Sequence, residues 1–450
     1  MLVGVIGSWW RRDAQGGRSV SVMPAWSIWV GAVVLLGVAA VSMWTLLALF
    51  GGGSPQDQIR LEIVKLAGGI VVGTGGAAAL LLAARRQRAL ELQLAQNERD
   101  LAHKELVAAD ARHDAAERRI TELYASAAEQ LGSDTAPVRL AALHALERLA
   151  QDNPGHRQTV VDLLCAYLRM PFAGPGEVDP EQQDGHRQET QVRLTAQRLL
   201  TTHLRPGAEA TFWADVDLDL TRATLLDWDM ADCCVRGASF DGAVFHGDAS
   251  FHRAEFRGAV SLRGAVLVDA ASFDAARFHD VARFGGTRCR GEISFRHAGF
   301  DGAVSFDGAR FHGPASFAEG ELRGETSFRH TAFDATASFR EATFHDVAFG
   351  AAEFLDTASF DGTRFHGSTS FGGTRLPGRA SFREAEFHDA VWFGRTERGV
   401  PDLSGARVLV PDQLPDHDLL RGLPGWRLTV DGATPDEDQR RWRRFEPATD

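Results

Sequence analysis

The sequence predicts an all-β solenoid with four-sided coils, preceded by a transmembrane hairpin and an α-helical segment. Three observations support this prediction. Bulky apolar residues recur at every fifth or sixth position from Leu220 to Phe393. Two runs without any charged side chain, 26–50 and 66–84, come before this array. A segment of strong helix formers without proline, 85–133, follows the second run.

Composition excludes several classes of protein. The net charge of −12 over 450 residues argues against a generally basic nucleic-acid binder. Four cysteines without C-x-x-C spacing exclude a disulfide scaffold and a thiolate zinc finger. No zincin, P-loop or nucleophile-elbow motif occurs, so we expect no enzyme, no catalytic residue, no cofactor and no metal site.

The two uncharged runs predict a transmembrane hairpin over 26–84, after an N-terminal tail over 1–25. The first run corresponds to ~37 Å of helix and the second to ~28 Å, each enough to cross a bilayer. The alternative is a signal peptide, because arginines precede the first run. However, the apolar core of a signal peptide has only about 7–15 residues, and here a second run follows. We therefore expect membrane lipid to contact both spans.

Two further features bear on the hairpin. Gly69, Gly73 and Ala77 form a small-residue face, which favours either packing between the two spans or homodimerisation. Three arginines flank each end of the hairpin, whereas the loop 51–65 holds only Arg60 and Lys65. This distribution predicts a multi-pass plasma-membrane protein with both termini, and hence the repeat domain, in the cytoplasm. Cysteines without plausible partners suit a reducing compartment.

The middle of the chain is predicted to be helical. Residues 85–133 form a juxtamembrane helix, whose apolar stripe is broken by Asp110 and Asp114, so we expect a solvated spacer rather than a continuous coiled coil. Residues 134–170 predict a helical hairpin that turns at Asn153-Pro154-Gly155. Residues 171–204 are a linker with a short helix from about Gln191 to Leu204.

The repeat array, 205–395, has its own geometry. The apolar centres are five residues apart from Leu220 to Phe245, and the steps then alternate between six and five. Neither helical nor simple strand periodicity produces such steps, but a coil that turns a corner once per unit does. Each centre, and a small residue two positions before it, then points inward. We expect the corners at glycines such as Gly242, Gly247, Gly258, Gly264, Gly302 and Gly308.

Four units close one coil of 20 residues at first and 22 residues afterwards, which gives about eight coils and a rod of roughly 38 Å. Phenylalanine is then predicted to stack on phenylalanine, and alanine on alanine, in successive coils. Residues 396–450 are predicted to cap the last coil, because an uncovered strand edge would promote end-to-end association.

The units Ala238-Ser239-Phe240-Asp241-Gly242 and Ala309-Arg310-Phe311-His312-Gly313 resemble the pentapeptide-repeat family. This resemblance implies a right-handed quadrilateral β-helix. The whole chain resembles the membrane-anchored pentapeptide-repeat-containing proteins of GC-rich bacteria, which have no established common activity. The resemblance implies a non-enzymatic scaffold that binds an unknown protein partner. The alternative is a DNA-mimicking protein that binds a topoisomerase, like the quinolone-resistance members, but arginines interspersed along every coil disfavour it.

Two residue types in this region could carry chemistry. Cys289 and Cys233 occupy inward positions of the repeat, and neither Cys165 nor Cys234 lies beside an activating base, so we expect all four to be inert. Histidines directly follow six of the centres and are predicted to point outward: His246, His279, His312, His345, His366 and His388. A five-residue step after Phe344 should align the last three on one face, ~4.8 Å apart. The sequence favours a solvated face there over a metal-binding or pH-sensing ladder.

Overall fold

The structure is a computed structural model. It describes isolated positions between 30 and 48 and at 414, 415 and 423, together with residues 55–174, 183–207, 210–376, 379–393, 401–411, 425–431 and 440–448. The chain divides into two compact units, 1–112 and 113–450.

The first unit contains most of one long helix, α2 (Pro55–Leu131). The helix includes the predicted second span and the juxtamembrane helix, but it begins at Pro55, so residues 55–65 are helical and not the loop that the sequence predicted. The predicted first span, 26–50, lies mostly outside the described residues. Among the described residues, no helix combines the length and the apolar character needed to cross a membrane.

The second unit begins with the predicted helical hairpin. It consists of α3 (Ala136–Asp152), a 3-10 turn η1 (Pro154–His156) and α4 (Arg157–Arg169). The next helix, α5 (Gln183–His203), starts at Gln183 and not near Gln191, so part of the predicted linker is helical. These helices bury a common apolar face that includes Leu143, Leu146, Leu164 and Leu200, together with the end of α2 at Leu131.

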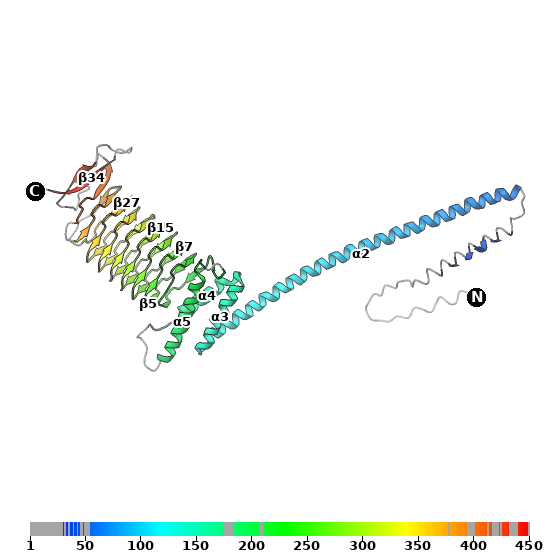
Figure 1. Cartoon of the computed structure of the whole chain (residues 1–450), viewed down its shortest axis with the longest axis horizontal. Helices are drawn as coiled ribbons and strands as arrows, with labels where there is room; N and C mark the ends of the chain where they lie inside the picture. The colour runs from blue at the N-terminus through cyan, green and yellow to red at the C-terminus, as the bar shows by residue number, and fades with distance from the viewer. Residues whose placement is uncertain are drawn as a thin grey trace. The chain divides into compact units, whose positions relative to one another are not determined.

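In the described part of the second unit, short strands form four sheets whose pairings are parallel up to β32 (Figure 1). Sheet A contains, in spatial order, β1 (Asp217–Asp219), β4 (Gly237–Ser239), β8 (Val260–Ser261), β12 (Ala282–Arg283), β16 (Val304–Ser305), β20 (Thr326–Ser327), β24 (Val347–Ala348), β28 (Thr369–Ser370) and β31 (Val391–Trp392). Sheet B contains β2 (Thr224–Leu226), β5 (Val244–His246), β9 (Val266–Leu267), β13 (Arg288–Cys289), β17 (Arg310–Phe311), β21 (Ala332–Phe333) and β25 (Glu353–Phe354).

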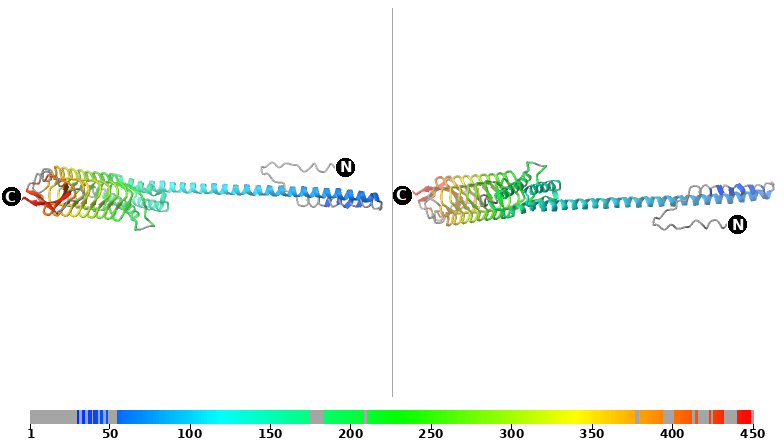
Figure 2. Two further views of the ribbon diagram at one scale, coloured as in Figure 1. Left: turned by 90° about the horizontal axis from the view of Figure 1, so that it is seen from above. Right: turned by 90° about the horizontal axis from the view of Figure 1, so that it is seen from below.

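Sheet C contains β6 (Ala249–Ser250), β10 (Ala271–Ser272), β14 (Ile293–Ser294), β18 (Ala315–Ser316), β22 (Ala337–Ser338), β26 (Ala358–Ser359) and β29 (Ala380–Ser381). Sheet D contains β3 (Cys234–Val235), β7 (Glu255–Phe256), β11 (Arg277–Phe278), β15 (Gly299–Phe300), β19 (Glu321–Leu322), β23 (Thr343–Phe344), β27 (Arg364–Phe365), β30 (Glu386–Phe387), β32 (Arg407–Pro411), β34 (Arg440–Pro447) and β33 (Trp426–Asp431). The chain visits one sheet after another, so each circuit adds one strand to every sheet, and the further views in Figure 2 show the coils stacked as rungs.

The register confirms the predicted coil lengths. Asp217 pairs with Gly237, a coil of 20 residues, and Ala238 pairs with Val260, a coil of 22 residues. The core also stacks as predicted. Phe273 and Phe295 lie face to face with ring centroids 4.8 Å apart, and Phe284 meets Phe295 edge-on at 5.3 Å. Both geometries are favourable for aromatic pairs, so each coil adds burial and aromatic contact to the next.

Two kinds of corner alternate around the coil. After the centres that follow sheets A and C, the second residue has a positive φ, as at Gly264 (+65°), although Arg253 (+53°) shows that a non-glycine residue can also occupy this position. After the centres of sheets B and D, a glycine is needed for space where one occurs, and Gly247 has both constraints because its φ is also positive (+75°). A Cβ on Gly302 would lie 2.5 Å from the carbonyl carbon of Asp280 in the preceding coil. The glycines that the sequence analysis grouped together therefore have different physical roles.

Helices cover the N-terminal end of the solenoid, which the sequence did not predict (Figure 1). α4 contacts β1 and β2, and α5 contacts β2. Two glutamines take the place of a preceding strand. Gln197 donates to the oxygen of Leu226 (2.6 Å) and accepts from its N–H (3.0 Å). Gln158 does the same for Asp217, at 2.9 Å each way.

At the C-terminal end, sheet D continues into the cap region. β32 pairs with β30 in parallel, and β34 then pairs antiparallel with β32 and β33. Phe445 of β34 is buried and meets Phe387 of the last repeat coil edge-on. The hairpin of β33 and β34 therefore extends the sheet and covers part of the core at this end.

Candidate functional site: the outer faces of the solenoid

The outward side chains of sheets A and C are small. Sheet C presents a serine on every described strand, in register from coil to coil: Ser250, Ser272, Ser294, Ser316, Ser338, Ser359 and Ser381. Sheet A repeats this pattern with four exceptions on its described strands, Asp219, Arg283, Ala348 and Trp392. Small side chains leave these two faces flat, so another surface can approach the backbone closely.

Several of these serines bond to the neighbouring coil through a recurring aspartate. Ser294 donates to Asp274 at 2.5 Å, and the same carboxylate accepts the N–H of Arg296 at 3.0 Å. Asp307 is bonded in the same way to Ser327 and Arg329. The sequence signal is an S-F-D unit followed by S-F-R one coil later, which the spacing of the apolar centres alone does not reveal. The bonds hold one coil to the next at its corner.

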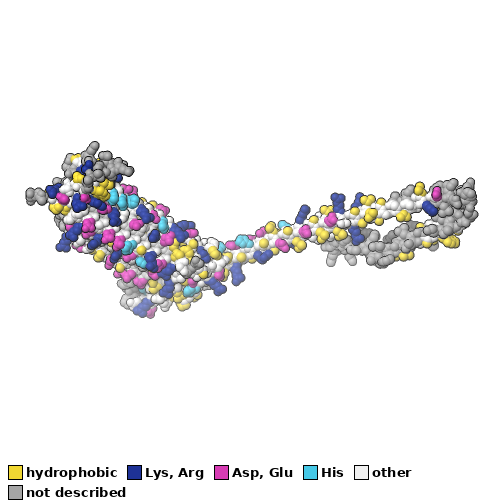
Figure 3. All heavy atoms as spheres, turned by 45° about the horizontal axis from the view of Figure 1, so that its top comes forward, with side chains coloured by type: hydrophobic (Ala, Val, Ile, Leu, Met, Phe, Trp, Pro, Cys, Tyr) yellow, Lys and Arg dark blue, Asp and Glu magenta, His cyan; other side chains and the backbone are white. Residues whose placement is uncertain are grey.

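Sheet D carries alternating charges. Asp301 accepts from His279 at 2.8 Å and from Arg323 at 2.7 Å, and Arg323 also reaches Glu321 at 2.8 Å. Burial acts to raise the pKa of Asp301, but the bonds from His279 and Arg323 outweigh it and keep that pKa below its ordinary value. Acidic and basic side chains are interspersed over the face drawn in Figure 3. Pairing of this kind reduces the negative potential of an otherwise acidic array.

The predicted histidine column exists. His345, His366 and His388 follow β23, β27 and β30 on sheet D, with ring centroids 5.6 and 4.5 Å apart. Histidine side chains also gather near the C-terminal end of the solenoid in Figure 3. The column ends against Trp442 of β34, whose ring lies 5.1 Å from that of His388. In the described part of the chain, no group of three or more potential ligands could hold a metal ion.

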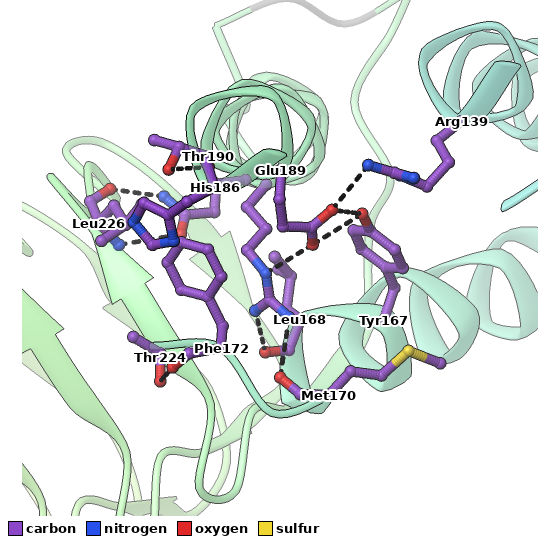
Figure 4. Close-up of polar contacts among 12 residues, drawn as sticks. Arg139, Tyr167, Leu168, Met170, Phe172, His186, Glu189, Thr190, Thr224 and Leu226 are labelled. Atoms are coloured by element: carbon purple, nitrogen blue, oxygen red, sulfur yellow. Dashed lines mark hydrogen bonds and ion pairs between the residues drawn. The ribbon is translucent and has the colours of Figure 1, made fainter. Parts of the chain in front are cut away.

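A buried polar cluster joins the helices at the other end of the solenoid (Figure 4). The guanidinium of Arg193, 1% exposed, donates to the oxygens of Leu168 and Met170 at 3.0 and 2.8 Å and to Glu189 at 2.8 Å. Tyr167 donates to the same carboxylate at 2.9 Å. Burial and this carboxylate raise the pKa of Tyr167. Glu189 also pairs with Arg139 of α3 at 3.1 Å, so the cluster joins α3, α4 and α5 and we assign it a structural role.

The cysteines are buried, as the repeat phase predicts for Cys233 and Cys289. Burial raises the pKa of Cys165 and of Cys233 to about 12, and it also raises the pKa of Cys234 and of Cys289. Thiols with such pKa values are protonated at neutral pH and are weak nucleophiles.

These observations define a β-solenoid with four sheets, closed by helices at one end and by a hairpin at the other. A family model described as "Pentapeptide repeats (9 copies)" matches residues 240–299, 273–321, 295–343, 306–353 and 349–397. This region of the chain belongs to the pentapeptide-repeat family. No curated protein and no solved structure matches the chain.

Proposed function

We propose that this protein is a membrane-anchored, non-enzymatic scaffold whose solenoid docks a protein partner. The observation that carries the proposal is the pair of flat, serine-lined faces on sheets A and C. Sheet C offers a small side chain in every described rung, about 4.8 Å apart, and sheet A does so in most rungs, which gives a regular surface suited to protein contact. Repeat solenoids use extended surfaces of this type for binding.

The membrane anchor rests on the sequence. The uncharged runs 26–50 and 66–84 are long enough to span a bilayer, and the arginines around them favour cytoplasmic termini. We propose a cytoplasmic solenoid held at the inner face of the plasma membrane by these two spans. A tether of this kind would concentrate a partner at the membrane.

Proximity labelling from the solenoid in intact cells tests the scaffold. Two single substitutions place a bulky charge on one flat face each: Ser316→Arg on sheet C and Ala348→Arg on sheet A. Neither side chain has a hydrogen bond to lose among the described residues, and Arg283 shows that the pattern accepts arginine. We expect one of the two substitutions to eliminate the labelling of specific proteins and the other to leave their labelling unchanged. Identical labelled sets for both variants and for the chain lacking 205–395 would contradict the proposal.

DNA mimicry is the alternative function. It requires a strongly negative surface, whereas arginines on sheet D pair with neighbouring carboxylates. A supercoiling assay with purified gyrase distinguishes the two. The scaffold proposal expects no inhibition at micromolar protein.

A further inference from the structure

The C-terminal hairpin is attached to the solenoid beside the histidine column. β32 pairs with β30, the strand that His388 follows, and β34 is the next strand of the same sheet. Trp442 of β34 meets the ring of His388 nearly edge-to-face, with an interplanar angle of 79°. The last ring of the column is therefore part of the interface between the hairpin and the repeat coils.

Few negative groups face this ring. Among the described residues, Nε2 of His388 has no hydrogen-bond partner, and it lies 3.7 Å from Oε2 of Glu386. That carboxylate is already shared by Arg407, at 2.6 Å, and Arg364, at 3.8 Å. The guanidinium of Arg407 also lies 4.4 Å from the centre of the Trp442 ring. In the part of the chain that the structure describes, the groups shown around His388 are thus His366, Arg407, Trp442 and the carboxylate of Glu386.

We propose that acid releases the C-terminal hairpin from the solenoid, because protonation would place two positive rings, His366 and His388, 4.5 Å apart beside Arg407 and Trp442. Release would separate β34 from β32 and remove Phe445 from its contact with Phe387. It would also expose the edge of sheet D, which could then pair with a strand of another chain. The pH would therefore control whether this edge of sheet D can pair with another chain.

The titration of His388 has the required sign. Burial lowers the pKa of His388 below its ordinary value of 6.5, and the neighbouring His366 lowers it further, outweighing Glu386. In the released state the ring is exposed and titrates near the ordinary value. The docked hairpin is thus fully favoured above about pH 6.5, and docking weakens as the pH falls from there towards the lowered pKa.

Hydrogen exchange of the full chain in detergent micelles tests the proposal. Rates are corrected for the intrinsic effect of pH, and peptides from β34 are compared with peptides from β8 to β22. Between about pH 7.5 and 5.5 we expect β34 to lose protection, because the pKa of His388 is lower in the docked state than in the released state, while the repeat coils stay protected. Unchanged protection of β34, or an equal loss along the whole solenoid, would overturn the proposal.

Two variants connect the effect to the column. His388→Asn removes the titrating ring and should abolish the loss at low pH. His279→Asn is the matched control, since His279 follows a strand of the same sheet but pairs with Asp301 far from the hairpin, and it should respond like the parent. If His388→Asn already lowers the protection of β34 at pH 7.5, His366→Asn serves as the test variant instead. It should reduce the loss of protection of β34 at low pH. If both His366→Asn and His388→Asn lose as much protection of β34 at low pH as the parent chain, the proposal is wrong.

Discussion

Glycine residues at the corners of the solenoid have two separate physical roles. At Gly264 the backbone has a positive φ, which glycine adopts without strain. At Gly302 the φ is ordinary, but the corner lies against the backbone of the coil below. The sequence shows a glycine at both corners and cannot distinguish them, because the second role depends on contact between residues 22 positions apart.

Gly302→Ala should destabilise the solenoid by about 1–3 kcal/mol, because the new methyl group overlaps backbone atoms that cannot move aside. The added Cβ would meet Asp280 and Val281 within 3 Å. Gly299→Ala, three residues away, is the matched control, since nothing lies within 4 Å of its Cβ. Thermal unfolding followed by circular dichroism measures both. Equal melting temperatures for the two variants would contradict the close approach.

The element that the sequence missed is the helical cover of the first coil. The repeat could be predicted because every coil places apolar residues at the same inward positions. The same spacing therefore recurs many times along the sequence. Gln158 and Gln197 each bond a single strand residue, so no repeated pattern marks them. In the sequence they are ordinary polar residues of amphipathic helices. Their pairing with Asp217 and Leu226 depends on tertiary packing alone. Arg193 was missed for the same reason, although its place between apolar neighbours on α5 was a signal.

Gln197→Ala should cost about 1–3 kcal/mol, because it leaves the N–H and C=O of Leu226 buried without partners. The exposed Gln191 on the same helix provides the control substitution Gln191→Ala, which should change stability little. Urea unfolding gives the free energies. In addition, the amide hydrogen of Leu226 should exchange faster in Gln197→Ala but not in Gln191→Ala. An unchanged exchange rate in Gln197→Ala would mean that another group bonds this strand.

Deletion of residues 396–450 should make the array associate end to end and unfold at lower temperature. The deletion removes β32, β33 and β34 and uncovers Phe387, leaving an open strand edge on sheet D. Light scattering and thermal unfolding measure the two effects. A truncated chain that stays monomeric and keeps its stability would show that these residues are not a cap.

At the scale of the whole chain, the parts differ in what stabilises them. The repeat coils are stabilised by contacts between neighbours, so their stability adds up coil by coil. The segment before them carries the two predicted spans, whose stability would depend on lipid.

The topology of the predicted hairpin can be tested in intact cells. With the four native cysteines replaced, Ser54→Cys should react with an impermeant maleimide, because position 54 lies between the two predicted spans and is expected outside. Ser250→Cys on β6 should be protected until the cells are opened, since the solenoid is expected in the cytoplasm. Labelling of Ser250→Cys with protection of Ser54→Cys would place the solenoid outside.

Residues 278–310 and 311–343 are near-duplicates of 33 residues each, as RGEISFRH at 290–297 and RGETSFRH at 323–330 show, and this repeat restricts how such a chain can grow. One copy is one and a half coils, so His279 follows a strand of sheet D whereas His312, one copy later, follows a strand of sheet B. Inserting a single further copy upstream of β23 would move every later residue by half a turn. The histidine column and the hairpin would then project from the opposite side. Two inserted copies add a full number of turns and restore the original direction. A chain that must keep the column on one side can therefore gain copies only in pairs.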